Sequence, residues 1–88
     1  MKIFKWTLEI TDKQVVSMPL GAKILGVKMQ GDSPQMWALC DENAPKEQRH
    51  IAIYGTGNPI HGEPGKYITT FLVEFGIHVF HVFEIDLT

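Results

Sequence analysis

Cysteine is nearly absent from this sequence, which contains only Cys40 among its 88 residues. A single cysteine cannot form an intramolecular disulfide, and such sparse cysteine usage fits a reducing compartment. It also excludes the paired-cysteine metal sites that stabilise many small domains. The domain must therefore gain its stability from a thin hydrophobic core, which oligomerisation can enlarge.

Long hydrophobic runs and a large excess of one charge are lacking as well. No segment reaches the roughly 20 apolar residues of a membrane span, and charged residues interrupt segment 1–6, unlike a signal peptide. The 8 basic and 10 acidic residues give a formal net charge of −2, without the basic stripe of a duplex-DNA-binding protein. We therefore expect a cytosolic protein that contacts neither duplex DNA nor a membrane.

Short β-strands account for most of what the sequence does contain. In residues 3–10, apolar and polar side chains alternate with the period of two that marks a half-buried strand. Turn residues at 31–34 and at 75–76 separate pairs of such runs and predict hairpins. No longer window has convincing helical periodicity. Further strands are expected at 15–18, 22–30, 35–41, 48–54, 66–74 and 77–85.

These six to seven short strands predict an all-β protein, a small antiparallel sandwich or barrel, with a single domain over residues 1–88. The last run is apolar on both faces: Val79 and Phe83 lie on one side, and Phe80 and Val82 lie on the other. A strand of this kind is normally buried on both sides. Either Phe80 and Val82 form an interface with another subunit, or the run is a central strand in the wall of a barrel.

The most distinctive segment is a loop at residues 55–65, which contains four glycines and two prolines. Successive glycine amides can form an anion-binding nest, and tyrosines and cationic side chains flank the loop, a combination that suits a nucleotide. The alternative is a plain connection across one end of the fold, with glycines that satisfy turn geometry. The candidate ligand-binding residues are Arg49, Tyr54, Gly55, Thr56, Gly57, Asn58, His61, Lys66 and Tyr67.

Residue sets that carry catalysis or metal binding are not recognisable. Of the four histidines, His78 and His81 are the closest pair, but on a strand two side chains three residues apart lie on opposite faces. Cys40 is followed by Asp41, whose carboxylate opposes formation of the thiolate. We therefore expect no metal site, no cofactor and no enzymatic activity.

Five segments together resemble a family of short, uncharacterised phage and prophage proteins, a domain of unknown function. The segments lie at 18–25, 37–41, 53–57, 65–71 and 78–84, in order and over most of the chain. This sequence departs from the family at Thr69, where the family tends to have glycine. The resemblance implies a phage accessory protein of the host cytoplasm, of a kind that often counters host defences.

Two hypotheses of function follow from the loop, the apolar strand and this resemblance. In the first, a non-enzymatic homo-oligomer binds and sequesters a small anionic ligand, such as a nucleotide immune signal, through the 55–65 loop. In the second, the protein is an inhibitor or adaptor that binds a host defence protein through an exposed apolar strand at 77–85. An enzyme such as a nucleotide hydrolase is disfavoured, because no nucleophile, base or metal set is recognisable.

Overall fold

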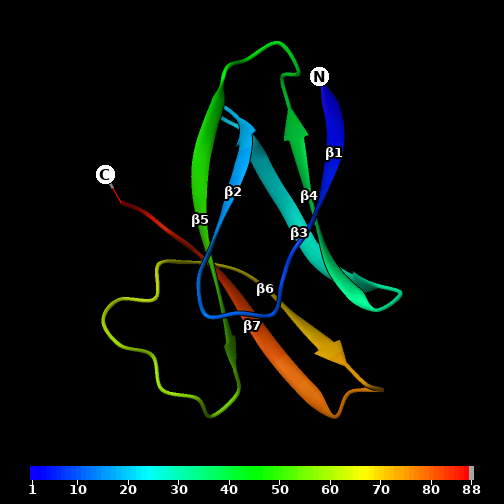
Figure 1. Ribbon diagram of the computed structural model, residues 1–88, viewed down its shortest axis with the longest axis vertical. Coiled ribbons are helices and arrows are strands. Elements are labelled where there is room, and N and C mark those ends of the chain that lie inside the picture. The colour runs from blue at the N-terminus through cyan, green and yellow to red at the C-terminus, as the bar shows by residue number, and fades with distance from the viewer. Residues whose placement is uncertain (88) are drawn as a thin grey trace.

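The computed structural model describes residues 1–87, and this part of the chain forms seven β-strands and no helix (Figure 1). Each segment that the sequence pattern predicts as a strand is one. The strands are β1 (Lys2–Thr7), β2 (Gln14–Pro19), β3 (Lys23–Gln30), β4 (Ser33–Cys40), β5 (Lys46–Gly55), β6 (Lys66–Val73) and β7 (His78–Ile85).

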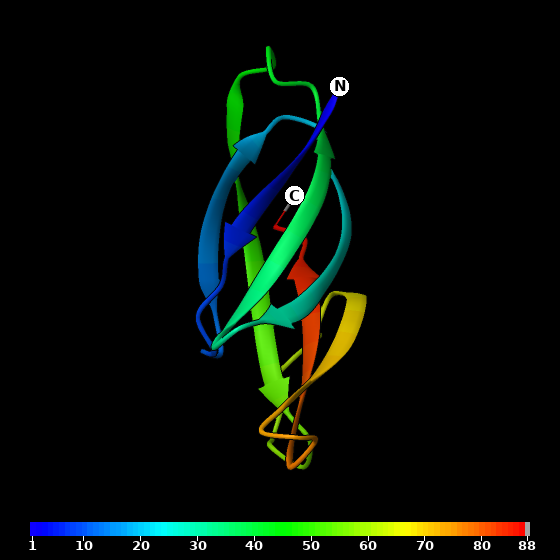
Figure 2. The same cartoon turned by 90° about the vertical axis from the view of Figure 1, so that its right-hand side faces the viewer.

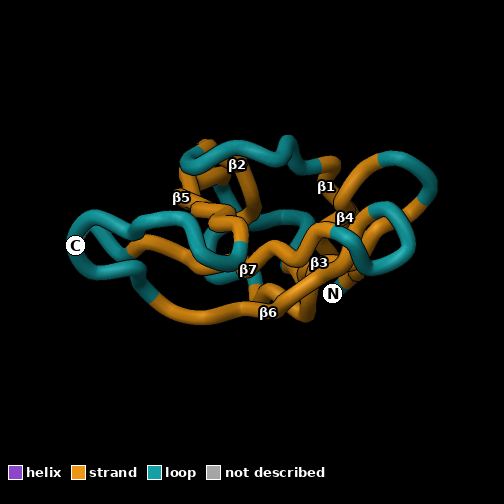
Figure 3. The backbone as a smooth tube through the Cα atoms, turned by 90° about the horizontal axis from the view of Figure 1, so that it is seen from below, coloured by secondary structure: helices purple, strands orange, loops and turns teal. Residues whose placement is uncertain are grey.

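The strands form two antiparallel sheets that pack face to face. The three-stranded sheet has the order β1-β4-β3, and the four-stranded sheet has the order β2-β5-β7-β6. Figure 2 shows the arrangement from the side, and Figure 3 shows the two groups of strands from below. The edge strands β3 and β6 lie next to each other but belong to different sheets. The predicted all-β antiparallel sandwich is confirmed.

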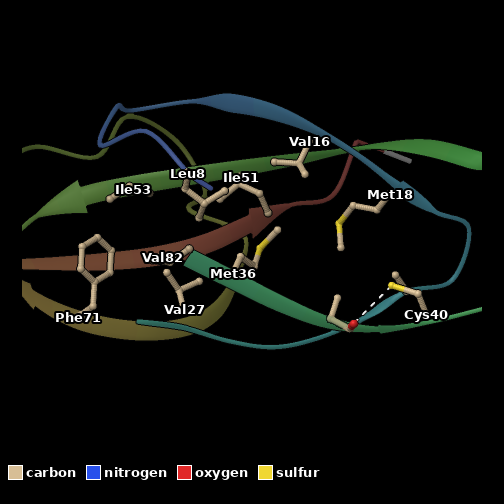
Figure 4. Close-up of a cluster of buried hydrophobic side chains, with 12 residues drawn as sticks. Leu8, Val16, Met18, Val27, Met36, Cys40, Ile51, Ile53, Phe71 and Val82 are labelled. Atoms are coloured by element: carbon tan, nitrogen blue, oxygen red, sulfur yellow. Dashed lines mark hydrogen bonds between the residues drawn. The ribbon is translucent and has the colours of Figure 1, made fainter. Parts of the chain in front are cut away.

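The hydrophobic core lies between the two sheets (Figure 4). Leu8, Val27 and Met36 come from the side of the three-stranded sheet, and Ile51 and Val82 come from the four-stranded sheet. These five side chains are at most 2% exposed. Because side chains alternate along a strand, each strand contributes every second residue to this core and turns the others away from it.

The first strand ends at Thr7, three residues earlier than the alternation of residues 3–10 predicts. The side chain of Gln14 accounts for the difference. Its amide oxygen accepts a hydrogen bond from the backbone N–H of Glu9 (3.1 Å), and its amide nitrogen donates to the Glu9 carbonyl oxygen (2.6 Å). The Gln14 side chain thus takes the backbone hydrogen bonds of Glu9 that a partner strand would otherwise make. The alternation of apolar and polar residues contains no sign of this contact.

Strand β7 is central in its sheet, between β5 and β6. Val82 is 0% exposed within the core, and Phe80 stacks on Phe71 with ring centroids 5.6 Å apart. The predicted subunit interface is therefore corrected at Val82, because this side chain has no surface left for another chain. The alternative interpretation, a central strand in the wall of the fold, describes β7.

The outer face of the four-stranded sheet, which points away from the core, is also partly covered. Ala52 and Tyr54 of β5 belong to this face, yet they are only 0% and 9% exposed. Tyr54 and Tyr67 pack against Phe83 of β7, with ring centroids 6.1 and 5.6 Å apart. The 56–65 loop bulges from the side of the four-stranded sheet that faces away from the other sheet (Figures 1 and 3).

Candidate functional site

The glycine-rich loop begins with a turn that closes on itself. The backbone N–H of Asn58 donates to the carbonyl oxygen of Gly55 (3.1 Å), and Gly57 has φ +86°, which glycine adopts without strain. The N–H of Thr56 donates to the carbonyl oxygen of Val79 on β7 (3.1 Å). These two amides are satisfied within the chain, so Thr56 and Asn58 have no free backbone N–H for an anion. His61, farther along the loop, is exposed.

A chain of side-chain hydrogen bonds crosses the outer face from the same loop. Oγ1 of Thr56 lies 2.7 Å from Nε2 of His81, whose Nδ1 lies 3.0 Å from Oγ1 of Thr70. The hydroxyl of Tyr67 lies 2.7 Å from the same Thr70 oxygen. A neutral imidazole protonated at Nε2 satisfies all three contacts, because Tyr67 then donates to Thr70 and Thr70 donates to Nδ1. These side-chain hydrogen bonds connect the start of the loop to β6 and β7.

Arg49 lies on the inner side of β5 and is held by β7 and by the turn before β3. Its Nε and Nη2 donate to the two carboxylate oxygens of Glu84 on β7, and its Nη1 donates to the carbonyl oxygen of Ala22 (2.8 Å). The side chains of Arg49 and Glu84 are only 16% and 20% exposed. The hydrogen bonds to Glu84 raise the pKa of Arg49 above its ordinary value. Arg49 therefore cross-links the fold. Its Nε and Nη2 donors, which could bind a ligand in bidentate fashion, are already used by Glu84.

A cleft of about 370 Å³ opens beside this ion pair, where β3 meets β6. A register shift interrupts each strand there, between Ile24 and Gly26 in β3 and between Tyr67 and Thr69 in β6. Such a shift leaves one residue unpaired and bends the strand, so two neighbouring irregularities help to open the space between the sheets. We call this space the seam cleft. Its lining consists of Gly21, Ala22, Lys23, Ile24, Leu25, Arg49, Lys66, Tyr67, Ile68 and Glu84.

The seam cleft carries an excess of positive charge. Lys23, Lys66 and Arg49 line it, against the single carboxylate of Glu84. Glu84 is already paired with Arg49. Within residues 1–87, no carboxylate lies at salt-bridge distance from the exposed ammonium group of Lys23 or Lys66. Two lysines without a carboxylate partner within residues 1–87 therefore contribute to the lining of the same small space, an arrangement that attracts an anion.

A neighbouring cleft of about 410 Å³ on the other side of the ion pair has the opposite character. Glu47, Glu84 and Asp86 supply three carboxylates there, against Arg49 and Lys66. The net charge of its lining is thus negative, which repels an anion. The seam cleft is therefore the better candidate for a ligand of negative charge.

The structure brings together only part of the predicted ligand-binding set. Arg49, Lys66 and Tyr67 line the seam cleft, whereas residues 55–58 lie at the other end of β5, about 20 Å away at roughly 3.3 Å per residue. Tyr54 belongs to the outer face, where its ring and that of Tyr67 pack on Phe83. On the same face, the Tyr67 hydroxyl is linked through Thr70 and His81 to Thr56. A single site that contains all of these residues is therefore corrected to two separate places on the sheet.

Two charged residues of the seam cleft, Lys23 and Glu84, are absent from the predicted ligand-binding set. Nothing in the sequence places Lys23 near Lys66, because β3 and β6 meet only through packing of the two sheets. One usable signal was present: Arg49 and Tyr54 are an odd number of positions apart on one strand, so their side chains point to opposite faces. The alternation of side chains along β5 thus separates the guanidinium of Arg49 from the ring of Tyr54.

Three further features of the described residues bear on chemistry. Within residues 1–87, no three His, Cys, Asp or Glu side chains form a group that could hold a metal ion. Over the same range, the chain has no helix that is long and apolar enough to cross a membrane. Cys40 is 0% exposed, and its Sγ donates to the carbonyl oxygen of Ala38 at 3.4 Å (Figure 4). This thiol is therefore a core residue.

Fold and site together define a small antiparallel β-sandwich with a basic cleft between two edge strands. A family model matches residues 1–87. The chain belongs to the DUF7352 family, a domain of unknown function. No curated protein and no solved structure matches the chain. The phage origin implied by the sequence resemblance stays a prediction.

Proposed function

We propose that this domain is a non-catalytic binding protein whose seam cleft takes a small anionic ligand, such as a nucleotide. The observation that carries the proposal is the pair of exposed lysines at the cleft, Lys23 on β3 and Lys66 on β6, which have no carboxylate partner within residues 1–87. An anion between the two edge strands would neutralise both ammonium groups at once. The ligand would then also bridge the two sheets.

The other residues of the cleft would have different roles. The donors of Arg49 are occupied by Glu84 and the Ala22 carbonyl oxygen, so Arg49 would position the cleft wall and leave direct binding to the lysines. Tyr67 would contribute only to the cleft wall, because its ring packs on Phe83 and its hydroxyl contacts Thr70 on the outer face. The volume of about 370 Å³ lies near the lower end of the about 300–1,000 Å³ typical of small-molecule sites.

The 55–65 loop has no part in this ligand site. Its first amides bond within the chain, and the loop starts far from Lys23 and Lys66 along β5. The last residue of the loop, Gly65, has a different importance, because a Cβ there would overlap the carbonyl oxygen of Glu84. The loop would thus act as a connection whose end packs tightly on β7, which was the alternative interpretation of its glycines.

The wider role rests on the resemblance to phage and prophage proteins. In that setting, the domain would act in the cytoplasm of an infected host and sequester a nucleotide immune signal. The second hypothesis, an inhibitor that binds a host defence protein through β7, has less support. Strand β7 is central in its sheet, and Val82 is fully buried in the core.

The proposal is tested by titrating ¹⁵N-labelled protein with ADP, with ADP-ribose and with inorganic phosphate as three separate probes. Binding in the seam cleft would shift the amide resonances of residues 22–25 and 66–68. The double variant Lys23→Ala/Lys66→Ala should weaken binding by on the order of tenfold or more, because both uncompensated cations are removed. Lys28→Ala, an exposed lysine on the same strand as Lys23, is the matched control.

Unchanged affinity in Lys23→Ala/Lys66→Ala would exclude the seam cleft as the binding site. An equal loss in Lys28→Ala would instead show attraction by the general surface charge. Both variants alter exposed side chains, so their folding can be verified by the thermal unfolding midpoint before the titration. Binding of inorganic phosphate as tight as that of ADP would restrict the ligand class to phosphate itself.

A further inference from the structure

The three-stranded sheet differs in charge from the rest of the protein. Strands β1, β3 and β4 contain four lysines and no aspartate or glutamate, although the whole chain has 8 basic and 10 acidic residues. Three of these lysines, Lys5, Lys23 and Lys28, are exposed and belong to the face that points away from the core. A protein of negative net charge therefore has one strongly positive sheet face.

No acidic side chain in the described part of the chain neutralises these lysines. Within residues 1–87, no carboxylate lies at salt-bridge distance from Lys5, Lys23 or Lys28. The ammonium group of Lys5 donates instead to the neutral side chain of Gln30 on β3 (2.8 Å). Because β4 lies between β1 and β3, this contact extends the Lys5 side chain across the middle strand. Figure 2 views the molecule from the side of this sheet.

An aromatic side chain lies at the centre of the same face. Trp37 belongs to the middle strand β4 and is paired with Lys5 on one side and with Gly26 on the other. Its neighbours Met36 and Ala38 are fully buried in the core, so Trp37 points to the outer face, where it is half-buried. A Cβ added at Gly26 would meet no atom within 4 Å. The space beside Trp37 is therefore open.

The backbone geometry at position 26 does not require glycine. The φ angle of Gly26 lies outside the left-handed region that favours glycine, so the register shift next to it would tolerate a side chain. Glycine within a strand lowers stability and often marks a place where a ligand comes close to the backbone. What glycine provides at this position is the open space beside the ring of Trp37.

We propose that this surface, the basic sheet face, binds a single-stranded nucleic acid. It consists of Lys5, Lys23, Gly26, Lys28 and Trp37. Proteins bind single strands by stacking bases on aromatic side chains and by neutralising phosphates with cationic ones. Here one base lies over Gly26 against Trp37, and its flanking phosphates lie near Lys5 and Lys28. A duplex keeps its bases paired inside, so it offers this face phosphates and no free base.

Charge and shape together favour a single-stranded nucleic acid over an acidic peptide. The lysines alone would attract either partner, but the open space beside Trp37 suits a planar base. The backbone of β4 is paired on both sides, so a peptide cannot add to it as a further strand. The proposal is also independent of a ligand in the seam cleft. Lys23 belongs to both surfaces, and the experiment therefore leaves Lys23 unchanged.

Fluorescence anisotropy of a fluorescein-labelled oligothymidylate of about 12 nucleotides tests the proposal. Contacts of three lysines with phosphates predict a slope of about −2 for log affinity against log salt, a loss of roughly 15–20-fold between about 50 and 200 mM. Lys5→Ala/Lys28→Ala should lower affinity at least about tenfold and reduce the slope to about −0.7. Lys13→Ala/Lys46→Ala removes two exposed lysines outside this face and is the matched control.

Gly26→Val tests the open space without removing a charge. Valine suits a strand and would meet no atom there, so the thermal unfolding midpoint should stay the same or rise. Affinity for the oligonucleotide should nevertheless fall at least about fivefold, because a base can no longer approach Trp37. Unchanged affinity in Gly26→Val overturns the proposal, since the bound strand then does not use this space.

Three other results would also overturn the proposal. They are a wild type that does not bind at about 200 µM protein, an equal loss in Lys13→Ala/Lys46→Ala, and binding of a duplex or of hexaglutamate as tight as that of the single strand. In Lys5→Ala/Lys28→Ala, ADP should still shift the amide resonances of residues 22–25 and 66–68. That readout separates failure of the basic sheet face from failure of the seam cleft.

Discussion

The ion pair between Arg49 and Glu84 should be the most sensitive polar contact of this fold. Arg49→Met removes a bidentate, charge-assisted contact and a hydrogen bond to the Ala22 carbonyl oxygen, and it leaves the carboxylate of Glu84 mostly buried without its partner. Breaking a fully buried pair costs about 3–5 kcal/mol. Because the two side chains retain 16% and 20% exposure, we expect a loss of about 2–4 kcal/mol.

That loss is a large part of the stability of so small a protein. Domains have a free energy of unfolding of about 0.05–0.15 kcal/mol per residue, which gives roughly 4–13 kcal/mol for 88 residues. At about 4–8 °C per kcal/mol for this size, Arg49→Met should lower the unfolding midpoint by roughly 10–30 °C. Urea unfolding followed by circular dichroism measures the free-energy difference directly.

A double-mutant cycle separates pairing from burial. Arg49→Met/Glu84→Met replaces the pair by apolar side chains and should recover stability to within about 1 kcal/mol of the wild type, because the desolvation cost disappears with the charges. The exposed contact between Glu74 and His78 (3.4 Å) is the control, and Glu74→Gln should cost about 0.5 kcal/mol or less. If Arg49→Met costs no more than Glu74→Gln, the reasoning from burial is refuted.

Two other predictions concern Gly65, which precedes β6, and Glu42, which lies between β4 and β5. At Gly65, φ is +98° and an added Cβ would overlap the carbonyl oxygen of Glu84, whereas Gly31 has φ +63° and open space around it. Gly65→Ala should therefore lower the free energy of unfolding in urea by at least about 2 kcal/mol more than Gly31→Ala. Equal losses for the two variants would show that the structure relieves the overlap without cost. A backbone hydrogen bond and, more weakly, the nearby N-terminal ammonium hold the pKa of Glu42 below its ordinary value of 4.5. The stability that this carboxylate contributes is present above pH 4.5 and is lost as the pH falls through the lower folded-state pKa of Glu42. Glu42→Gln should therefore be less stable than the wild type at pH 7 and equally stable at about pH 2. A stability difference that persists at low pH would show that titration of Glu42 is not its cause.

The strands could be predicted because the information about them is local. Alternation of apolar and polar residues, interrupted by turn residues, located every strand from β1 to β7. The predicted end of β1 is wrong because a side chain outside the alternating segment forms hydrogen bonds with the backbone of that segment. Gln14 ends β1 early in this way, and no periodicity of residues 3–10 contains that contact.

The candidate site could be predicted only in part, because the sequence shows neighbours along the chain and not across sheets. Lys66 and Tyr67 line the same cleft as Arg49, because β6 begins where the glycine-rich loop ends. The contacts of the glycine-rich loop are not local in the sequence either. Its Thr56 donates the backbone N–H to the carbonyl oxygen of Val79, a partner that only the packed hairpin supplies.

The fold class, the position of each strand and the face to which each side chain points can be read from the sequence, because they follow from a period of two along the chain. Tertiary structure alone decided which strands meet without a hydrogen-bonded ladder. The contact of β3 with β6 brings Lys23 and Lys66 to one cleft. Such charges are distant in sequence, and only the packing of two sheets around one core sets the distance between them.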